Sequence, residues 1–246
     1  MNICVLSKDL RYKALSNLLV ANGYILLENT KDGLMKCDVL ILSVTLEYTE
    51  NEIKEVGRLL KSEAIVFSGN GEMVSSLIGR DVIDYSKNNE FLQRNAELTS
   101  EACLSLLYNE LKMSLKGQRI LVTGYGRIGK SLCGILESLG ADVYVYARRE
   151  EMQREASGLG YKIVKLDNLP KLDIVLNTVP QRIISKNLTD SRLKNTVLVE
   201  LASKPGGYED KSMVIDGGRL PGRILPISAA EIIYNTIVKY FPYRKG

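Results

Sequence analysis

The sequence predicts an α/β protein of two domains, each a parallel β-sheet covered by helices. Short apolar runs alternate with amphipathic stretches along most of the 246 residues, which is the pattern of repeated strand–helix units. The runs are continuously apolar, as strands buried on both faces require. A long helical stretch near the middle is followed by a second opening strand, so the alternation starts again in a second domain.

The first domain is expected to comprise residues 1–96. An opening strand at 1–6 leads through a polar turn into a helix at 11–23, which ends on Gly23 as helices often do. Further apolar runs predict strands at 39–45 and 64–69, with a helical pattern at 49–62 between them.

A connecting helix is predicted at 95–115, with Thr99 or Ser100 as its N-cap, and it opens a second domain at 97–227. A last helix at 228–241 is expected to return to the first domain, which residues 228–246 would complete. The remaining elements of the second domain alternate in order: strand 117–122, helix 128–139, strand 142–147, helix 150–158, and strands 161–164, 173–180 and 196–202.

The composition is that of an ordinary globular protein. The net charge of +4 comes from 33 basic and 29 acidic residues without a basic run, so no nucleic-acid binding is expected. No apolar stretch approaches the roughly 18 residues of a membrane span, and the N-terminus lacks a secretory signal pattern, so we expect a cytoplasmic protein without membrane contact. Four cysteines without a C-x-x-C pair are expected to be buried, reduced thiols: Cys4, Cys37, Cys103 and Cys133.

The chain contains no histidine, and this absence excludes several classes of enzyme. Imidazole is the commonest general base near neutral pH and the commonest zinc ligand. A hydroxyacid dehydrogenase with a histidine base, a zincin and a serine hydrolase with a conventional triad are therefore excluded. No metal site is predicted, and the sequence identifies no catalytic proton acceptor.

The stretch ILVTGYGRIGKS, residues 120–131, fits two nucleotide-binding motifs at once. Gly124, Gly126 and Gly129 form G-x-G-x-x-G, the dinucleotide fingerprint of a Rossmann domain, while Gly124, Gly129, Lys130 and Ser131 form the G-x-x-x-x-G-K-S loop that cradles nucleoside triphosphates. The dinucleotide motif requires a second strand about twenty residues on, and 142–147 supplies it. The triphosphate motif requires a strand ending in Asp for magnesium, and its best candidate, Asp216, follows a weak strand. We therefore predict a dinucleotide site.

The residues after the second strand favour NADP over NAD. An NAD site normally places Asp or Glu there to bind the ribose 2′-hydroxyl, whereas this strand ends at Ala147 and is followed by Arg148 and Arg149, which suit a 2′-phosphate. The sequence NTVP is expected to end the fourth strand, facing the nicotinamide. The predicted cofactor contacts are Gly124, Tyr125, Gly126, Arg127, Ile128, Gly129, Ala147, Arg148, Arg149, Thr178, Val179 and Pro180.

Seven motifs spread over the chain resemble those of the dipicolinate synthase family, in its A subunits: VFSG (66–69), NAELTSEA (95–102), GYGRIG (124–129), AR (147–148), NTVP (177–180), LASKPGG (201–207) and LPGRILPISAAEI (220–232). The resemblance implies two Rossmann-like parallel-sheet domains in a hydroxyacid-dehydrogenase-like arrangement, with a substrate cleft between them. It implies NADP-dependent conversion of dihydrodipicolinate, a lysine-pathway intermediate, to dipicolinate during sporulation. The implied partner is a second, flavoprotein-like protein, the B subunit of the synthase, and a homo-oligomer is also considered.

The substrate implied by this resemblance is a small dicarboxylate, which requires cations and hydrogen-bond donors. Arg11 and Lys204 are the predicted carboxylate anchors; Lys204 stands where the family usually has Arg, so the planar bidentate fork is lost. Asn95, Thr99 and Ser228 are predicted to add hydrogen bonds, and Ser228, where the family usually has Thr, is expected to cap the last helix.

Two other functions stay open at this stage. One is another NADP-dependent oxidoreductase on the same scaffold. The other is a non-catalytic, nucleotide-binding subunit that regulates a second protein, a possibility kept open by the missing histidine.

Overall fold

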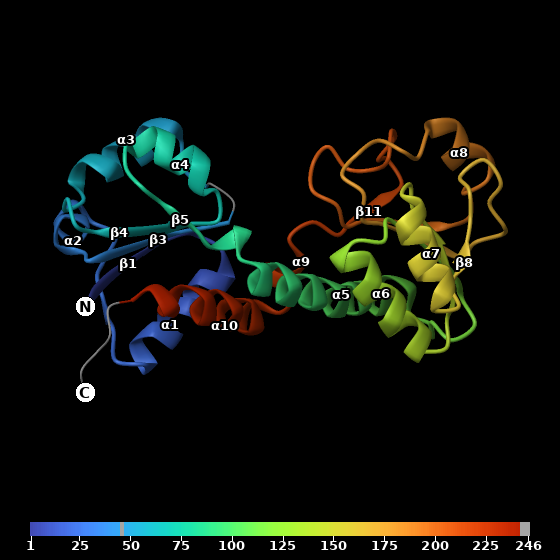
Figure 1. The fold of residues 1–246 in the computed structure, drawn as a ribbon, viewed down its shortest axis with the longest axis horizontal. Coiled ribbons are helices and arrows are strands. Elements are labelled where there is room, and N and C mark those ends of the chain that lie inside the picture. The colour runs from blue at the N-terminus through green and yellow to red at the C-terminus, as the bar shows by residue number, and fades with distance from the viewer. Residues whose placement is uncertain (45–46, 242–246) are drawn as a thin grey trace. The chain divides into compact units, whose positions relative to one another are not determined.

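The computed structural model describes residues 1–44 and 47–241 and divides the chain into two compact units (Figure 1). Unit 1 comprises Met1–Asn95 and Pro221–Gly246, and unit 2 comprises Ala96–Leu220. The expected division was 1–96 with 228–246, and 97–227; residues 221–227 thus belong to unit 1 in the structure. Each unit is an α/β domain with one parallel sheet, so the predicted fold class is confirmed.

The sheet of unit 1 has the strand order β2-β1-β3-β4-β5, and every neighbouring pair is parallel. The order reverses between β1 and β3, which makes the carboxyl ends of these strands the usual ligand-binding position of such a sheet. The strands are β1 (Asn2–Leu6), β2 (Ile25–Leu26), β3 (Val39–Leu42), β4 (Ile65–Ser68) and β5 (Ile83–Asp84).

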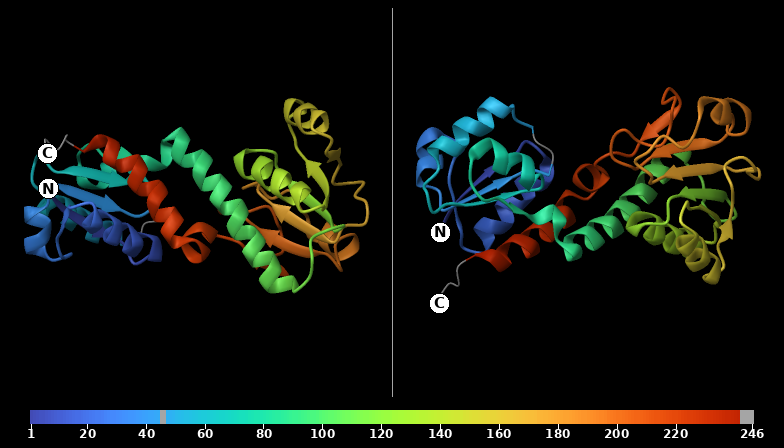
Figure 2. Two further views of the ribbon diagram at one scale, coloured as in Figure 1. Left: turned by 90° about the horizontal axis from the view of Figure 1, so that it is seen from below. Right: turned by 45° about the horizontal axis from the view of Figure 1, so that its top comes forward.

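Helices cover both faces of this sheet, as Figures 1 and 2 show. Alternate strand residues point to opposite faces. Thus Ile3 and Ile41 pack towards α1 (Leu10–Ala21) and α10 (Pro226–Ile237), whereas Cys4 and Leu40 pack on the opposite face. That face carries α2 (Lys31–Lys36), α3 (Glu50–Leu59) and α4 (Gly71–Ile78), and two short 3₁₀ helices complete the unit: η1 (Tyr85–Lys87) and η2 (Val238–Tyr240).

The sheet of unit 2 has the order β11-β10-β9-β6-β7-β8, again all parallel. This is the order 3-2-1-4-5-6 of a dinucleotide-binding domain, with the switch point between β6 and β9. The strands are β6 (Arg119–Thr123), β7 (Asp142–Tyr146), β8 (Lys162–Ile163), β9 (Ile174–Asn177), β10 (Val197–Glu200) and β11 (Val214–Asp216). The helices that lie wholly or mostly in this unit are α5 (Asn89–Leu111), α6 (Arg127–Ser138), α7 (Glu150–Gly158) and α8 (Lys186–Ser191). Another short helix, α9 (Leu220–Ile224), begins at the boundary with unit 1.

Two predicted helix starts were wrong. Helix α5 begins at Asn89, so Thr99 and Ser100 lie inside it instead of capping it, and the Ser100 hydroxyl donates to the carbonyl oxygen of Ala96. Helix α10 begins at Pro226, and its N-cap residue, Leu225, offers no side-chain bond, so Ser228 lies in the first turn and is not the cap. Other local signals start both helices earlier: Asn88 Oδ1 accepts from the Phe91 N–H at 3.0 Å at the start of α5, and Pro226 lies in the first turn of α10.

Strand ends differ from the predicted ranges by a few residues, and one predicted strand residue, Thr45, lies outside the described part of the chain. The sequence also gave no separate prediction for β2, α2, α4, β5 and α8. These elements have two to eight residues, too few to display a clear period.

Candidate cofactor and substrate sites

The glycine loop between β6 and α6 has the geometry of a dinucleotide site. Gly124 has φ +91° and makes the tight turn, and a Cβ there would lie 2.5 Å from the Thr178 Oγ1 atom. A Cβ at Gly129 would lie 2.1 Å from the Gly124 carbonyl oxygen, so this glycine permits close helix–strand packing. By contrast, nothing lies within 4 Å of a Cβ at Gly126, which leaves open space for a pyrophosphate over the start of α6. Each glycine thus meets the requirement of its place in the fingerprint.

The competing triphosphate motif is not supported by its two diagnostic residues. The Lys130 Nζ atom lies 2.6 Å from Glu155 Oε1 on α7, so the ammonium is already paired with a carboxylate. Asp216 ends β11, three strands away from β6 in the sheet, which is roughly 14 Å at the usual strand spacing. The geometry favours the dinucleotide motif.

The carboxyl end of β7 carries two exposed cations. Ala147 is buried, while Arg148 and Arg149 are both exposed and neither guanidinium pairs with a carboxylate among residues 1–44 and 47–241. The loop itself is held by the Gln153 side chain, whose Nε2 donates to the Ala147 carbonyl oxygen at 2.7 Å. Two unpaired guanidiniums on a supported turn can bind a phosphate by charge-assisted hydrogen bonds.

The other predicted cofactor residues fall in two places. Thr178 and Val179 lie against Gly124 at the switch point, and the Thr178 hydroxyl donates to the Thr123 carbonyl oxygen at 2.9 Å. Tyr125 is buried, with its ring 6.2 Å from that of Tyr161, and burial raises its pKa to about 12. Arg127 and Gly126 are exposed, Ile128 is half-buried, and Pro180 is exposed after β9.

A row of buried polar side chains at the edge of this sheet was missed by the sequence reasoning. Thr123, Asn177 and Glu200 end three neighbouring strands and are paired in register. The Thr123 hydroxyl donates to Asn177 Oδ1 at 2.5 Å, and the Asn177 amide donates to Glu200 Oε1 at 2.6 Å. The available signal was a polar residue that directly follows three apolar residues at the end of each strand.

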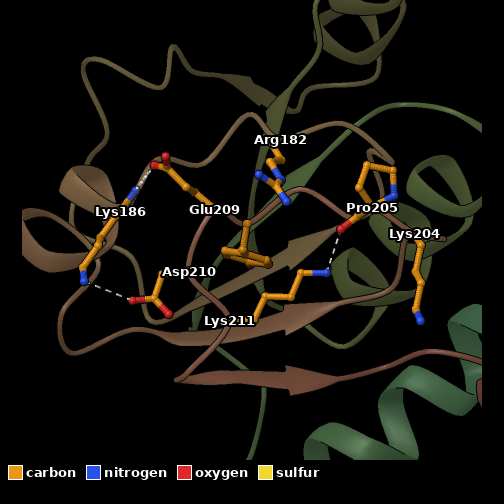
Figure 3. A pocket seen from close by; sticks show the side chains of 8 residues that line it. Arg182, Lys186, Lys204, Pro205, Glu209, Asp210 and Lys211 are labelled. Carbon is orange, nitrogen blue, oxygen red and sulfur yellow. Dashed lines mark hydrogen bonds and ion pairs between the residues drawn. The ribbon is translucent and has the colours of Figure 1, made fainter.

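Lys204 lies in the loop after β10 and lines an open depression at the same end of unit 2 (Figure 3). Two other cations of this depression are engaged: Lys186 Nζ lies 3.6 Å from Asp210 Oδ2, and Lys211 Nζ donates to the Pro205 carbonyl oxygen at 2.7 Å. The Lys204 ammonium and the Arg182 guanidinium have no such partner within the described ranges. Arg182 was not among the predicted site residues.

Arg11 in unit 1 is buried rather than displayed at the surface. Only 5% of the residue is exposed, and its Nε and Nη2 atoms donate to the Asp9 carboxylate, at 2.8 Å for Nη2. A Cβ at Gly222 would lie 2.8 Å from Arg11 Nε, so the start of α9 packs on the guanidinium. These contacts give Arg11 a clear structural role, and its role as a substrate anchor stays a prediction.

A buried tyrosine pair lies beside Arg11 at the switch point of unit 1. The backbone N–H of Val44 donates to the Tyr12 hydroxyl, which is hydrogen-bonded to the Tyr85 hydroxyl, and Tyr85 donates to the Leu42 carbonyl oxygen. Burial raises the pKa of Tyr12 to about 12 and that of Tyr85 well above its usual range. Neutral phenols thus anchor the end of β3.

The remaining predicted substrate residues lie on two helices. Asn95 and Thr99 are on α5, half-buried and buried respectively, and fall on either side of the unit boundary. Ser228 is half-buried in the first turn of α10. All four cysteines are buried with free thiols. Within the described residues, no three potential ligands gather to hold a metal ion, and no helix has the length and apolarity to cross a membrane.

Comparison with known proteins agrees with this geometry. Residues 89–201 match the family described as D-isomer specific 2-hydroxyacid dehydrogenase, NAD binding domain. The A subunit of dipicolinate synthase from Bacillus subtilis is 26% identical over 192 residues, which cover 72% of this chain and 65% of the relative. Erythronate-4-phosphate dehydrogenase of Marinomonas is 26% identical over 222 residues, covering 83% of this chain and 53% of the relative. The chain thus spans about half to two thirds of the length of these curated relatives.

The fold similarity extends further than the sequence identity. The crystal structure of the dipicolinate synthase A subunit from Bacillus halodurans superposes with a TM-score of 0.83, at 19% identity, over 97% of each chain. The resemblance inferred from the motifs is therefore confirmed. Residues 89–201 are thus similar to the NAD binding domain of D-isomer specific 2-hydroxyacid dehydrogenases, and the chain has a two-domain fold like that of the A subunit of dipicolinate synthase.

Proposed function

We propose that this protein is an NADP-dependent oxidoreductase that converts dihydrodipicolinate to dipicolinate, as the A subunit of a dipicolinate synthase. The observation that carries the proposal is the cofactor loop: an open Gly126 over the start of α6, with two unpaired arginines after β7. The similarity to the A subunits of dipicolinate synthases supports the choice of substrate.

The residues present fit a nicotinamide dinucleotide. The first amides of α6 and the open face at Gly126 would hold the pyrophosphate, and Arg148 and Arg149 would hold a 2′-phosphate. Thr178 and Val179, beside Gly124 at the switch point, would face the nicotinamide half. When bound, the oxidised nicotinamide supplies the hydride acceptor.

The chain's own residues would mainly bind and orient the substrate. The exposed ammonium of Lys204 and the guanidinium of Arg182 line one depression and suit the carboxylates of a small dianion. The reaction removes a hydride and a proton from the ring, and formation of an aromatic product favours both losses. A site without histidine is therefore chemically acceptable, because positioning the substrate beside the nicotinamide contributes more to the rate than a strong base would.

The biological setting proposed with this function is the cytoplasm of a sporulating bacterium. There the chain would act on a branch from the lysine pathway, together with the flavoprotein-like B subunit. A homo-oligomer of the A subunit is compatible with this assembly.

The proposal is tested with purified protein, NADP and freshly generated dihydrodipicolinate, in the presence and in the absence of the flavoprotein-like partner. We expect NADPH and dipicolinate to form in equal amounts. Binding of NADP without hydride transfer to any candidate substrate would instead identify a non-catalytic regulatory protein. Turnover of a different substrate would identify another oxidoreductase on the same scaffold.

A further inference from the structure

We infer that Glu200 is a positioning residue, which holds the loop 201–207 and thereby sets the place of Lys204. The inference rests on the proposed function for the role of Lys204, but its structural basis lies wholly within unit 2. Glu200 ends β10 and is only 6% exposed. A buried carboxylate is costly unless hydrogen bonds satisfy it, so its partners show what it does.

The Glu200 carboxylate binds both ends of the loop that carries Lys204. The backbone N–H of Ala202 donates to Oε1 at 3.0 Å, and the backbone N–H of Gly207 donates to Oε2 at 2.6 Å. A Cβ at Gly206 would lie 2.4 Å from Oε2, so the loop closes tightly around the carboxylate. One side chain therefore fixes the loop before and after Lys204.

The same carboxylate is connected to the segment that is proposed to face the nicotinamide. Asn177 donates to Glu200 Oε1 and also to the Val179 carbonyl oxygen at 2.9 Å, and it accepts from the Val179 N–H at 3.2 Å. With the Thr123 hydroxyl as a further donor, the Asn177 amide uses all of its usual hydrogen-bonding positions. Such a satisfied buried network is rigid and specifies one arrangement.

The hydrogen bonds of Glu200 indicate a structural role for its carboxylate and not a role in proton transfer. Its oxygens are occupied by three N–H donors, so it is not a proton acceptor for substrate. Instead it ties the Lys204 loop to the Thr178–Val179 segment through Asn177. Lys204, which has no partner of its own among the described residues, owes its position to this loop.

The test is a double-mutant cycle of Glu200→Gln and Lys204→Ala, with pyridine-2,6-dicarboxylate as a stable dianion probe on NADP-saturated protein. The Gln amide would present a donor to N–H groups, so we expect Glu200→Gln to weaken probe binding about tenfold or more. Because Glu200 acts through Lys204, the double variant should bind no more weakly than Lys204→Ala alone. NADP affinity should decrease less than probe affinity, since Glu200 reaches the Thr178–Val179 segment only through Asn177, whereas it binds the Lys204 loop directly. Asp190→Asn, an exposed charge loss on α8, is the matched control.

Hydrogen exchange separates this inference from the proposed function. In Glu200→Gln, a peptide covering residues 202–207 should exchange about tenfold faster or more, whether or not the probe binds. Unchanged exchange, or additive losses of affinity in the double variant, would overturn the positioning role. Failure of the unmutated protein to bind the probe would refute the substrate assignment alone. Should Glu200→Gln not fold, Glu200→Asp keeps the charge but shortens the reach, and it is expected to show the same faster exchange.

Discussion

The cofactor preference is the prediction that most directly tests the site, and the perturbation is the double variant Arg148→Ala, Arg149→Ala. Both guanidiniums are exposed and unpaired within the described chain, so their removal leaves no buried charge and breaks no internal bond. We expect the fold to be unaffected and only the attraction for a 2′-phosphate to be lost.

The magnitude follows from the exposure of the two side chains. A solvated ion pair contributes about 0.5–1 kcal/mol, well below the value for a buried one. Two such contacts amount to about 1–2 kcal/mol, which corresponds to about a 5- to 30-fold weaker affinity for NADP. The affinity for NAD, which lacks the 2′-phosphate, should stay within about twofold.

The assay is calorimetric titration of NADP and NAD into the unmutated protein, the double variant and Arg154→Ala. Arg154 is an exposed arginine on α7, the helix that follows the two arginines, so its variant controls for loss of positive charge. The preference for NADP should also decline with added salt, because exposed charges are screened. Tighter binding of NAD by the unmutated protein, or an undiminished preference in the double variant, would refute the reasoning.

Three further predictions concern the loop, unit 1 and pH. Gly126→Ala should leave the melting temperature unchanged yet weaken cofactor binding. Gly129→Ala should instead destabilise the fold, because its Cβ would meet a carbonyl oxygen at 2.1 Å. Thermal unfolding and titration with the cofactor distinguish the two effects. Arg11→Ala should lower the free energy of unfolding by about 3 kcal/mol, since it leaves the Asp9 carboxylate without its buried partner, and urea unfolding that matches the unmutated protein would contradict this. Burial raises the pKa of Tyr12 to about 12. The stabilisation that the neutral phenol contributes is therefore complete below about pH 10 and is lost as the pH rises towards 12. In Tyr12→Phe, the free energy of unfolding, measured by denaturation across this range, should decline less steeply with pH.

Much of the fold could be predicted from local sequence because its main elements are long and periodic. Helix α7 occupies the predicted residues 150–158, and α6 lies within one residue of its predicted bounds at each end. The three glycines were likewise predicted correctly as a tight turn, an open face for the pyrophosphate and a close helix–strand contact, since each of these roles requires a residue without a side chain. Local pattern was sufficient wherever one segment alone determines the geometry.

Tertiary structure decided the features that depend on residues far apart in the chain. Arg11 looked like an accessible cation beside a strand end, but α9, more than 200 residues later, covers it and Asp9 pairs with it. Glu200 escaped notice because a single acidic residue at the end of a strand has no pattern of its own. Only the parallel register, which places Thr123, Asn177 and Glu200 in one row, turns three separate strand ends into one hydrogen-bonded network.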